Sequence, residues 1–147
     1  MIGGLLKALF APEPEALPPT DARIALAALL VRIARSDGDY AQSEIDTIRR
    51  VLARRYGLDT GAVGDLMLVA ENLEREAPDT VRFTRAIKDA VPYEERKSVV
   101  AAAWEVVLAD GARAHEEDAL MRLIASLLGV NDRDSNLARQ KAAGRGA

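Results

Sequence analysis

The stretch ARSDGDYAQSE at residues 34–44 organises this chain, and it has a counterpart in VLADGARAHEE at residues 107–117. Each stretch contains the end of an apolar run, an Asp-Gly pair, five further residues and a glutamate. The aspartate and the glutamate of the second copy follow those of the first copy by the same 73 residues. The sequence therefore predicts a duplicated junction between two helices.

The segments around both junctions have the periodicity of packed helices. Helices are predicted over 20–36, 42–56, 60–76, 80–90, 92–109, 115–128 and 132–142, with a short amphipathic helix over 2–10. Asp59 or Thr60, Asp79 and Asp132 are the expected N-caps of three of them. The helices that lead into the junctions are apolar nearly all round, which is typical of the centre of a bundle. No segment alternates as a strand does.

The predicted fold class is therefore all-α, a compact bundle of about seven or eight helices built from two pseudo-repeated helical hairpins. The helices over 60–76 and 80–90 are expected to connect the two hairpins, whose pairing could bring the two junctions close together. We divide the chain into a short helix and Pro-rich linker at 1–19, a helical domain at 20–143 and a flexible tail at 144–147.

Composition excludes several classes of function. The absence of cysteine excludes disulfides and thiolate metal sites, and a single histidine leaves no ordinary zinc site. A net charge of −3 gives no general reason to expect nucleic-acid binding. No apolar run is long enough to cross a membrane, and the first ten residues lack the cleavage site of a signal peptide. We expect a cytoplasmic protein, with peripheral membrane association through residues 2–10 left open.

The glutamate of each junction has two alternative interpretations. If Ala41 and Ala114 are N-caps, Glu44 and Glu117 occupy the third helical position, from which a glutamate reaches back to the cap amide. Alternatively, the junctions bind a hard divalent cation such as Ca²⁺ or Mg²⁺, which prefers clustered oxygen ligands. The candidate ligands are Asp37, Asp39, Glu44, Asp110 and Glu117. The junctions are not EF-hands, because the upstream ligand positions are apolar or basic.

The sequence neighbours of the arginine cluster, of Trp104 and of His115 indicate where each of these features lies. The arginines 49, 50, 54 and 55 are expected to form a solvated helix face, with an acidic partner as the alternative. Trp104, in the apolar run before the second junction, is expected in the core. His115 is expected at the surface, at the start of a helix.

The two junctions and their surroundings resemble the TerB-like tellurite-resistance domain. The similarity lies in IARSDG with Glu44 in the first half, and in YEER, AWEVVLADG, Glu117 and LLGV in the second. It covers about residues 21–142. The resemblance implies a compact helical domain with acidic helix junctions, a role in tellurite or other chemical stress, and metal binding or sensing at membrane-linked complexes. Ala112 stands where Asp39 does, so the two copies are unequal.

Together these observations favour a non-enzymatic stress-response module that binds or senses a divalent cation through its acidic junctions. A metal-independent scaffold for an unidentified protein partner, using an exposed helix face or the N-terminal helix, is the alternative. A metal-dependent hydrolase is disfavoured, because the chain has no recognisable nucleophile motif and no glycine-rich phosphate loop.

Overall fold

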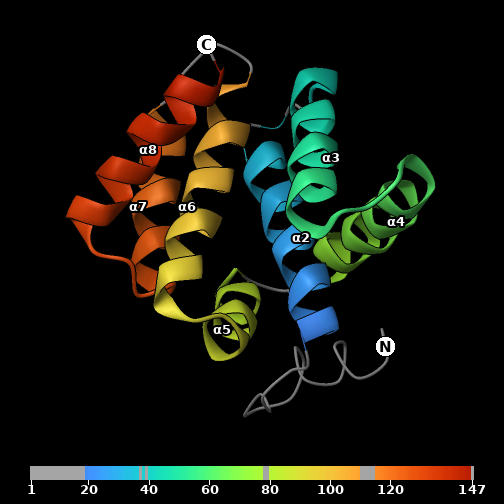
Figure 1. Cartoon of the computed structure of the whole chain (residues 1–147), viewed down its shortest axis with the longest axis horizontal. Helices are drawn as coiled ribbons and strands as arrows, with labels where there is room; N and C mark the ends of the chain where they lie inside the picture. The colour runs from blue at the N-terminus through green and yellow to red at the C-terminus, as the bar shows by residue number, and fades with distance from the viewer. Residues whose placement is uncertain (1–18, 37, 39, 78–79, 110–114, 147) are drawn as a thin grey trace.

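The computed structural model describes residues 19–36, 38, 40–77, 80–109 and 115–146, and α-helix is the regular secondary structure found in these ranges. The helices are α2 (Pro19–Arg35), α3 (Gln42–Tyr56), α4 (Thr60–Glu76), α5 (Val81–Ala90), α6 (Tyr93–Leu108), α7 (His115–Leu127) and α8 (Asp132–Gly146) (Figure 1). The seven helices form a bundle, which confirms the predicted all-α fold class. The helix expected over 2–10 lies outside the described residues.

Helices α2 and α6 form the centre of the bundle, because both are apolar on almost every face. Leu26, Leu29 and Leu30 of α2 are fully buried, and every residue from Val99 to Val107 of α6 is buried. Helices α3 and α4 cover one side of this pair, and α7 and α8 cover the other (Figure 1). Trp104 is 6% exposed, so its predicted place in the core is confirmed.

The duplication includes a third helix in each half. Both helices were predicted from the sequence, but their correspondence was not. Helix α4 packs chiefly on α2, and α8 packs chiefly on α6. Moving α4 along the chain by the 73-residue repeat brings its start to Arg133, one residue into α8. The prediction that both the 60–76 and 80–90 helices connect the halves was therefore wrong for the first of them. Only α5 lies between the two three-helix units in sequence.

Two predicted N-caps and the predicted end of α8 differ from the observed ones. Helix α5 has its N-cap at Thr80 instead of Asp79, without a side-chain cap bond. Helix α8 is capped by Asn131 instead of Asp132, because the Asn131 side-chain oxygen accepts a hydrogen bond of 2.8 Å from the Asp134 amide. The same helix continues to Gly146, past the predicted end at 142, since Ala142 is still packed in the core at 1% exposure.

Candidate functional site

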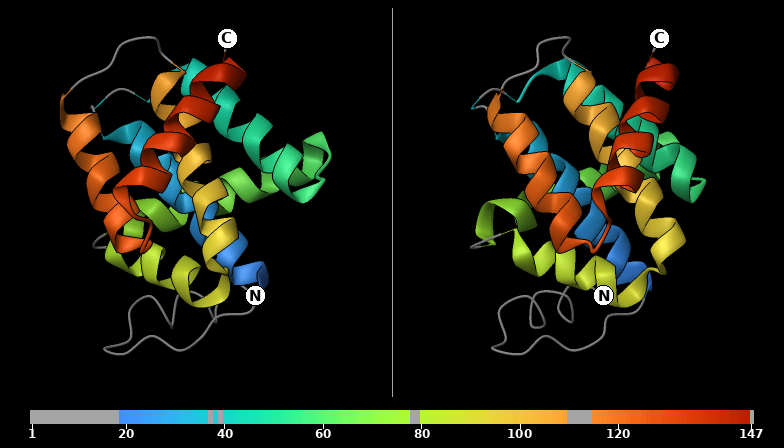
Figure 2. Two further views of the ribbon diagram at one scale, coloured as in Figure 1. Left: turned by 60° about the vertical axis from the view of Figure 1, so that its left-hand side comes forward. Right: turned by 90° about the vertical axis from the view of Figure 1, so that its left-hand side faces the viewer.

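The helix ends beside the two junctions lie at the same end of the bundle. The end of α2, the start of α3, the end of α6 and the start of α7 are all directed there, as both turned views show (Figure 2). Helix α3 also packs directly on α6. This arrangement follows from the duplication, because two like hairpins packed side by side place their corresponding ends together.

Of the five predicted ligands, the structure describes the side chain of Glu44 alone. Asp37, Asp39 and Asp110 lie outside the described residues, as does the side chain of Glu117, whose backbone belongs to α7. Their role as metal ligands stays a prediction. Within the described part of the chain, no three Asp, Glu or His side chains are grouped closely enough to hold a metal ion.

Glu44 occupies the helix-capping position predicted for it. Its side chain is buried at 2% exposure, and its Oε1 atom accepts a hydrogen bond of 3.3 Å from the backbone amide of Ala41. Ala41 is the N-cap of α3 and has an extended backbone conformation. The capping interpretation of Glu44 is therefore confirmed. A carboxylate at this position also interacts favourably with the positive end of the helix dipole.

The turn that ends α2 explains the glycine of the Asp-Gly pair. The backbone amide of Gly38 donates a 3.0 Å hydrogen bond to the carbonyl of Arg35, and Gly38 has a φ of +82°. Side chains with a Cβ atom rarely adopt this left-handed conformation, so glycine is the residue that fits. The Ser36 hydroxyl adds a 2.7 Å bond to the carbonyl of Ile33, which holds the last turn of α2 closed.

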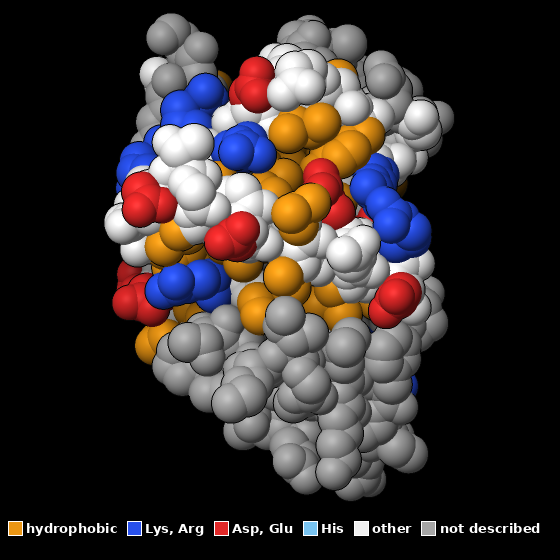
Figure 3. Space-filling view, turned by 90° about the vertical axis from the view of Figure 1, so that its right-hand side faces the viewer, with side chains coloured by type: hydrophobic (Ala, Val, Ile, Leu, Met, Phe, Trp, Pro, Cys, Tyr) orange, Lys and Arg blue, Asp and Glu red, His pale blue; other side chains and the backbone are white. Residues whose placement is uncertain are grey.

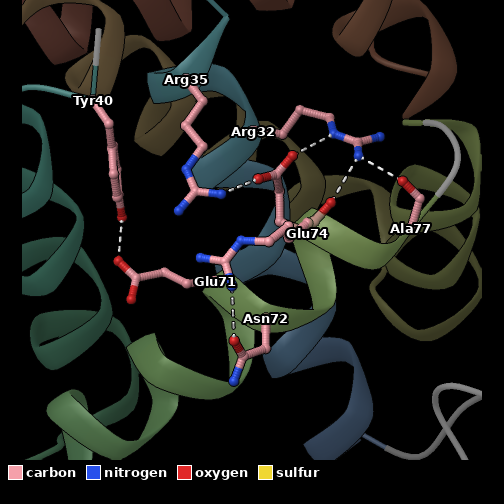
Figure 4. A network of polar contacts seen from close by, with 8 residues as sticks. Arg32, Arg35, Tyr40, Glu71, Asn72, Glu74 and Ala77 are labelled. Carbon is pink, nitrogen blue, oxygen red and sulfur yellow. Dashed lines mark hydrogen bonds and ion pairs between the residues drawn. The ribbon is translucent and has the colours of Figure 1, made fainter. Parts of the chain in front are cut away.

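A network of polar side chains ties the first junction to α4 (Figure 4). At the end of α2, Arg32 Nε and Arg35 Nη1 donate hydrogen bonds of 3.1 and 2.8 Å to the two carboxylate oxygens of Glu74. Arg32 Nη2 also donates to the backbone carbonyls of Glu74 and Ala77, at 3.0 and 2.9 Å. Because one arginine holds both a carboxylate and the last carbonyls of α4, the two helix ends are fixed to each other.

On the other side of the junction, Tyr40 makes a second contact with α4. Its hydroxyl donates a 2.8 Å hydrogen bond to Glu71 Oε2, and the Arg35 guanidinium lies 4.8 Å from the centre of its ring. Burial raises the pKa of Tyr40 well above its ordinary range, and the hydrogen bond to Glu71 raises it further. Tyr40 therefore stays protonated and keeps donating to Glu71 at any physiological pH.

This network has no counterpart in the second half. At the repeat distance of 73 residues, Leu108 replaces Arg35, Arg113 replaces Tyr40 and Gly144 replaces Glu71. These anchoring residues were not predicted from the sequence. Comparing the two halves position by position around the junctions would have found them, because three polar groups in one half meet unrelated residues in the other.

A groove beside the junctions lies between α3, α6 and the end of α8. It has a volume of about 580 Å³, and its lining includes Ser43 and Thr47 of α3 and Leu108 and Ala109 at the end of α6. At one side of it, Arg54 Nη2 lies 3.0 and 3.1 Å from the two carboxylate oxygens of Glu105.

The arginine-rich part of α3 is only partly the solvated face that was predicted. Arg54 binds the buried Glu105, and Arg55 Nη1 donates a 2.7 Å hydrogen bond to the hydroxyl of Ser98, so two of the four arginines attach α3 to α6. Arg50 is exposed as expected. The correction has a physical reason, since a charged Glu105 inside an apolar helix requires a cation from a neighbouring helix.

Comparison with protein families assigns the chain to a family. Residues 23–140 match the family model described as tellurite resistance protein TerB. The chain belongs to the TerB family. No curated protein and no solved structure gave a significant match. The resemblance inferred from the two junctions is therefore confirmed for the family.

The TerB match includes both junctions and extends from the first turns of α2 into α8. It lies inside the 20–143 domain predicted from the sequence. None of the helices within the described ranges is long and apolar enough to cross a membrane.

Proposed function

We propose that this TerB-family domain is a non-enzymatic stress-response module of the cytoplasm that binds a divalent cation, Ca²⁺ or Mg²⁺, at its junction end. Carboxylates Asp37, Asp39, Asp110 and Glu117 supply the oxygen ligands, with Glu44 as a further candidate. The observation that supports this most is the shared position of the helix ends beside both junctions (Figure 2). This arrangement allows two short acidic segments, each of which would bind a cation weakly by itself, to coordinate one ion together.

The donor set fits this class of ion. Carboxylate oxygens are hard ligands, and the chain has no cysteine and one histidine, so soft metals find few partners. The Arg35 and Tyr40 contacts fix the first junction to α4 at both of its sides. A loop held in this way loses less conformational freedom when an ion binds, which favours affinity.

Isothermal titration calorimetry with Ca²⁺, Mg²⁺ and Mn²⁺ tests the proposal. Without the full ligand set of an EF-hand, we expect a dissociation constant on the order of 10⁻⁴–10⁻³ M. The double variants Asp37→Asn/Asp39→Asn and Asp110→Asn/Glu117→Gln should weaken binding. Asp46→Asn is the matched control, because this carboxylate of α3 is exposed and, among the described residues, bonds the Gln42 side chain.

Glu44→Gln separates the two roles of that residue. Glutamine can replace glutamate as the returning side chain of a helix cap, but it is a much poorer ligand for a hard cation. Unchanged cation affinity in Glu44→Gln would assign Glu44 to capping alone. If millimolar cation gave no heat and no thermal shift, and the aspartate variants matched the unaltered protein, the cation proposal would be wrong.

The alternative function is a metal-independent scaffold for a protein partner. Leu68 of α4 is 63% exposed, and hydrophobic side chains gather near the middle of the face that carries α3 and α4 (Figure 3). Exposed apolar side chains of this kind mark interaction surfaces when they are contiguous. A Leu68→Gln variant, or deletion of residues 1–19, that keeps the fold but loses a co-purifying partner would favour this alternative.

A further inference from the structure

Arg23 is a charged side chain whose buried nitrogen has no acceptor. It lies in the second turn of α2, and its guanidinium carbon is 4.5 Å from the centre of the Tyr56 ring at the end of α3. Its Nε atom is buried and has no hydrogen-bond partner in the described part of the chain. A buried donor without an acceptor destabilises a folded protein, and more so when the group is charged. We therefore expect a hydrogen-bond acceptor next to Arg23 Nε.

A second guanidinium lies beside the same ring. The guanidinium carbon of Arg55 is 5.8 Å from the centre of Tyr56, and its Nη1 atom donates to the hydroxyl of Ser98. Glu95 is the described carboxylate whose charge acts on Tyr56, yet it forms no ion pair with either arginine. Within the described ranges, Arg23 and Arg55 are thus two neighbouring cations without a carboxylate partner.

Other arginines in this protein have the carboxylate partner that Arg23 and Arg55 lack within the described ranges. Arg32, Arg35 and Arg54 each bind a carboxylate at 2.8 to 3.1 Å. The Tyr56 ring offers Arg23 and Arg55 a cation–π contact, but the face of a ring accepts no hydrogen bond in the plane of the guanidinium. The Nε–H group of Arg23 thus remains without an acceptor among the described residues.

We propose that Arg23, Tyr56 and Arg55 form a carboxylate-binding site, and that the chain's own acidic linker occupies it through Glu13 and Glu15. These two glutamates lie in the sequence PEPE at residues 12–15, directly ahead of α2. The linker has no basic residue between 11 and 18, so its charge is opposite to that of the site. The proposal is independent of cation binding at the opposite end of the bundle.

The linker is long enough to reach the site. Glu15 precedes Pro19, the first residue of α2, by four residues, which span up to ~14 Å when extended. Arg23 follows Pro19 by four residues of helix, a rise of only about 6 Å. A chain that turns back ahead of Pro19 can therefore place Glu15 beside Arg23.

The linker carries two glutamates, and two cations lie beside the ring. Alternating prolines favour the polyproline II conformation, in which residues two apart are separated by ~6 Å along the axis. The guanidinium carbons of Arg23 and Arg55 lie 4.5 and 5.8 Å from the centre of the same ring. Because proline already restricts the free linker, less conformational entropy is lost when it docks.

Paramagnetic broadening in NMR spectra of the full chain tests the proposal. The chain has no cysteine, so Ala16→Cys provides a single attachment point for a nitroxide label next to the two glutamates. Docking predicts broadening of amide signals at the end of α3 and the start of α6. Glu13→Gln/Glu15→Gln, and separately Arg23→Gln, should abolish that broadening. The control Asp65→Asn/Glu76→Gln removes two exposed charges elsewhere and should leave it unchanged.

Three outcomes would overturn the proposal. The first is broadening that never includes residues near Tyr56. The second is broadening at Tyr56 that persists after both glutamates are neutralised, since apolar contacts would then hold the linker. The third is broadening seen only when a labelled copy is mixed with an isotopically enriched, unlabelled copy, because the occupant would then be a second molecule.

Discussion

Glu74→Gln is the substitution that tests most directly how α2 is held to α4. The Glu74 carboxylate is 11% exposed and accepts from two arginines, Arg32 Nε at 3.1 Å and Arg35 Nη1 at 2.8 Å (Figure 4). Glutamine preserves the shape of the side chain but removes its charge and one of its two acceptor atoms. Arg32 keeps its bonds to the backbone carbonyls of Glu74 and Ala77, which do not depend on the side chain.

The expected loss of stability in Glu74→Gln follows from these contacts. A hydrogen bond that involves a charged group contributes about 1.5–3 kcal/mol, and removing one partner of a fully buried ion pair costs about 3–5 kcal/mol. The arginine side chains are 18% and 28% exposed, so water compensates part of the loss. One acceptor and the backbone bonds also survive. We therefore expect unfolding free energy to fall by ~2 kcal/mol, which lowers the melting temperature by about 4–8 °C.

Urea and thermal unfolding, followed by the helical circular dichroism signal, measure this loss. Glu76→Gln is the matched control, since Glu76 lies on the same helix, is exposed and forms no ion pair with a described residue. Its effect should stay within ~0.5 kcal/mol. In a double-mutant cycle, Arg35→Gln should add little once Glu74→Gln is present. A Glu74→Gln change below ~0.5 kcal/mol, or full additivity with Arg35→Gln, would refute the reasoning.

Three further predictions concern two glycines, Tyr40 and the proposed ion. Gly57 has a φ of +63°, so Gly57→Ala should destabilise by ~1 kcal/mol in urea unfolding, whereas Gly64→Ala, inside α4 and without a close contact, should stabilise by ~0.5–1 kcal/mol. Burial raises the pKa of Tyr40 above 10.0, so the stability given by its neutral form is complete below pH 10.0 and is lost as pH rises above it; Tyr40→Phe should flatten this loss in melts at alkaline pH. If Ca²⁺ binds as proposed, a concentration of 100 times the dissociation constant should stabilise the fold by ~2.7 kcal/mol, measured as a thermal shift that chelator reverses.

Hydrophobic periodicity was enough to predict the helices and their order. Helix α3 has the predicted bounds of residues 42 and 56, and Gly57 ends it in the expected left-handed conformation, since apolar spacing and glycine are local signals. The caps of α5 and α8 were less predictable. Asp79 and Thr80, like Asn131 and Asp132, are adjacent residues that can each cap a helix, and tertiary packing decides between them.

The roles of polar side chains depended on contacts between distant parts of the chain. Glu44 could be predicted as a cap because its partner is three residues away. The pairs Tyr40–Glu71 and Arg54–Glu105 join residues 31 and 51 positions apart, and no local pattern identifies such partners. The sequence did contain one general signal, a lone Glu105 in an apolar helix, because a buried carboxylate requires a cation nearby.

The duplicated frame and the unequal junctions together explain how one half could specialise. Both halves place their junction at the same end of the bundle, so the frame requires no difference between them (Figure 2). The first copy nevertheless has Asp39 where the second has Ala112, and it has Arg35 and Tyr40 bound to acids of α4 where the second has Leu108 and Arg113. An extra ligand adds attraction for a cation, and an anchored loop loses less entropy when it binds. Both differences act in the same direction, so in the proposed function the first junction dominates cation affinity and the second completes its ligand set.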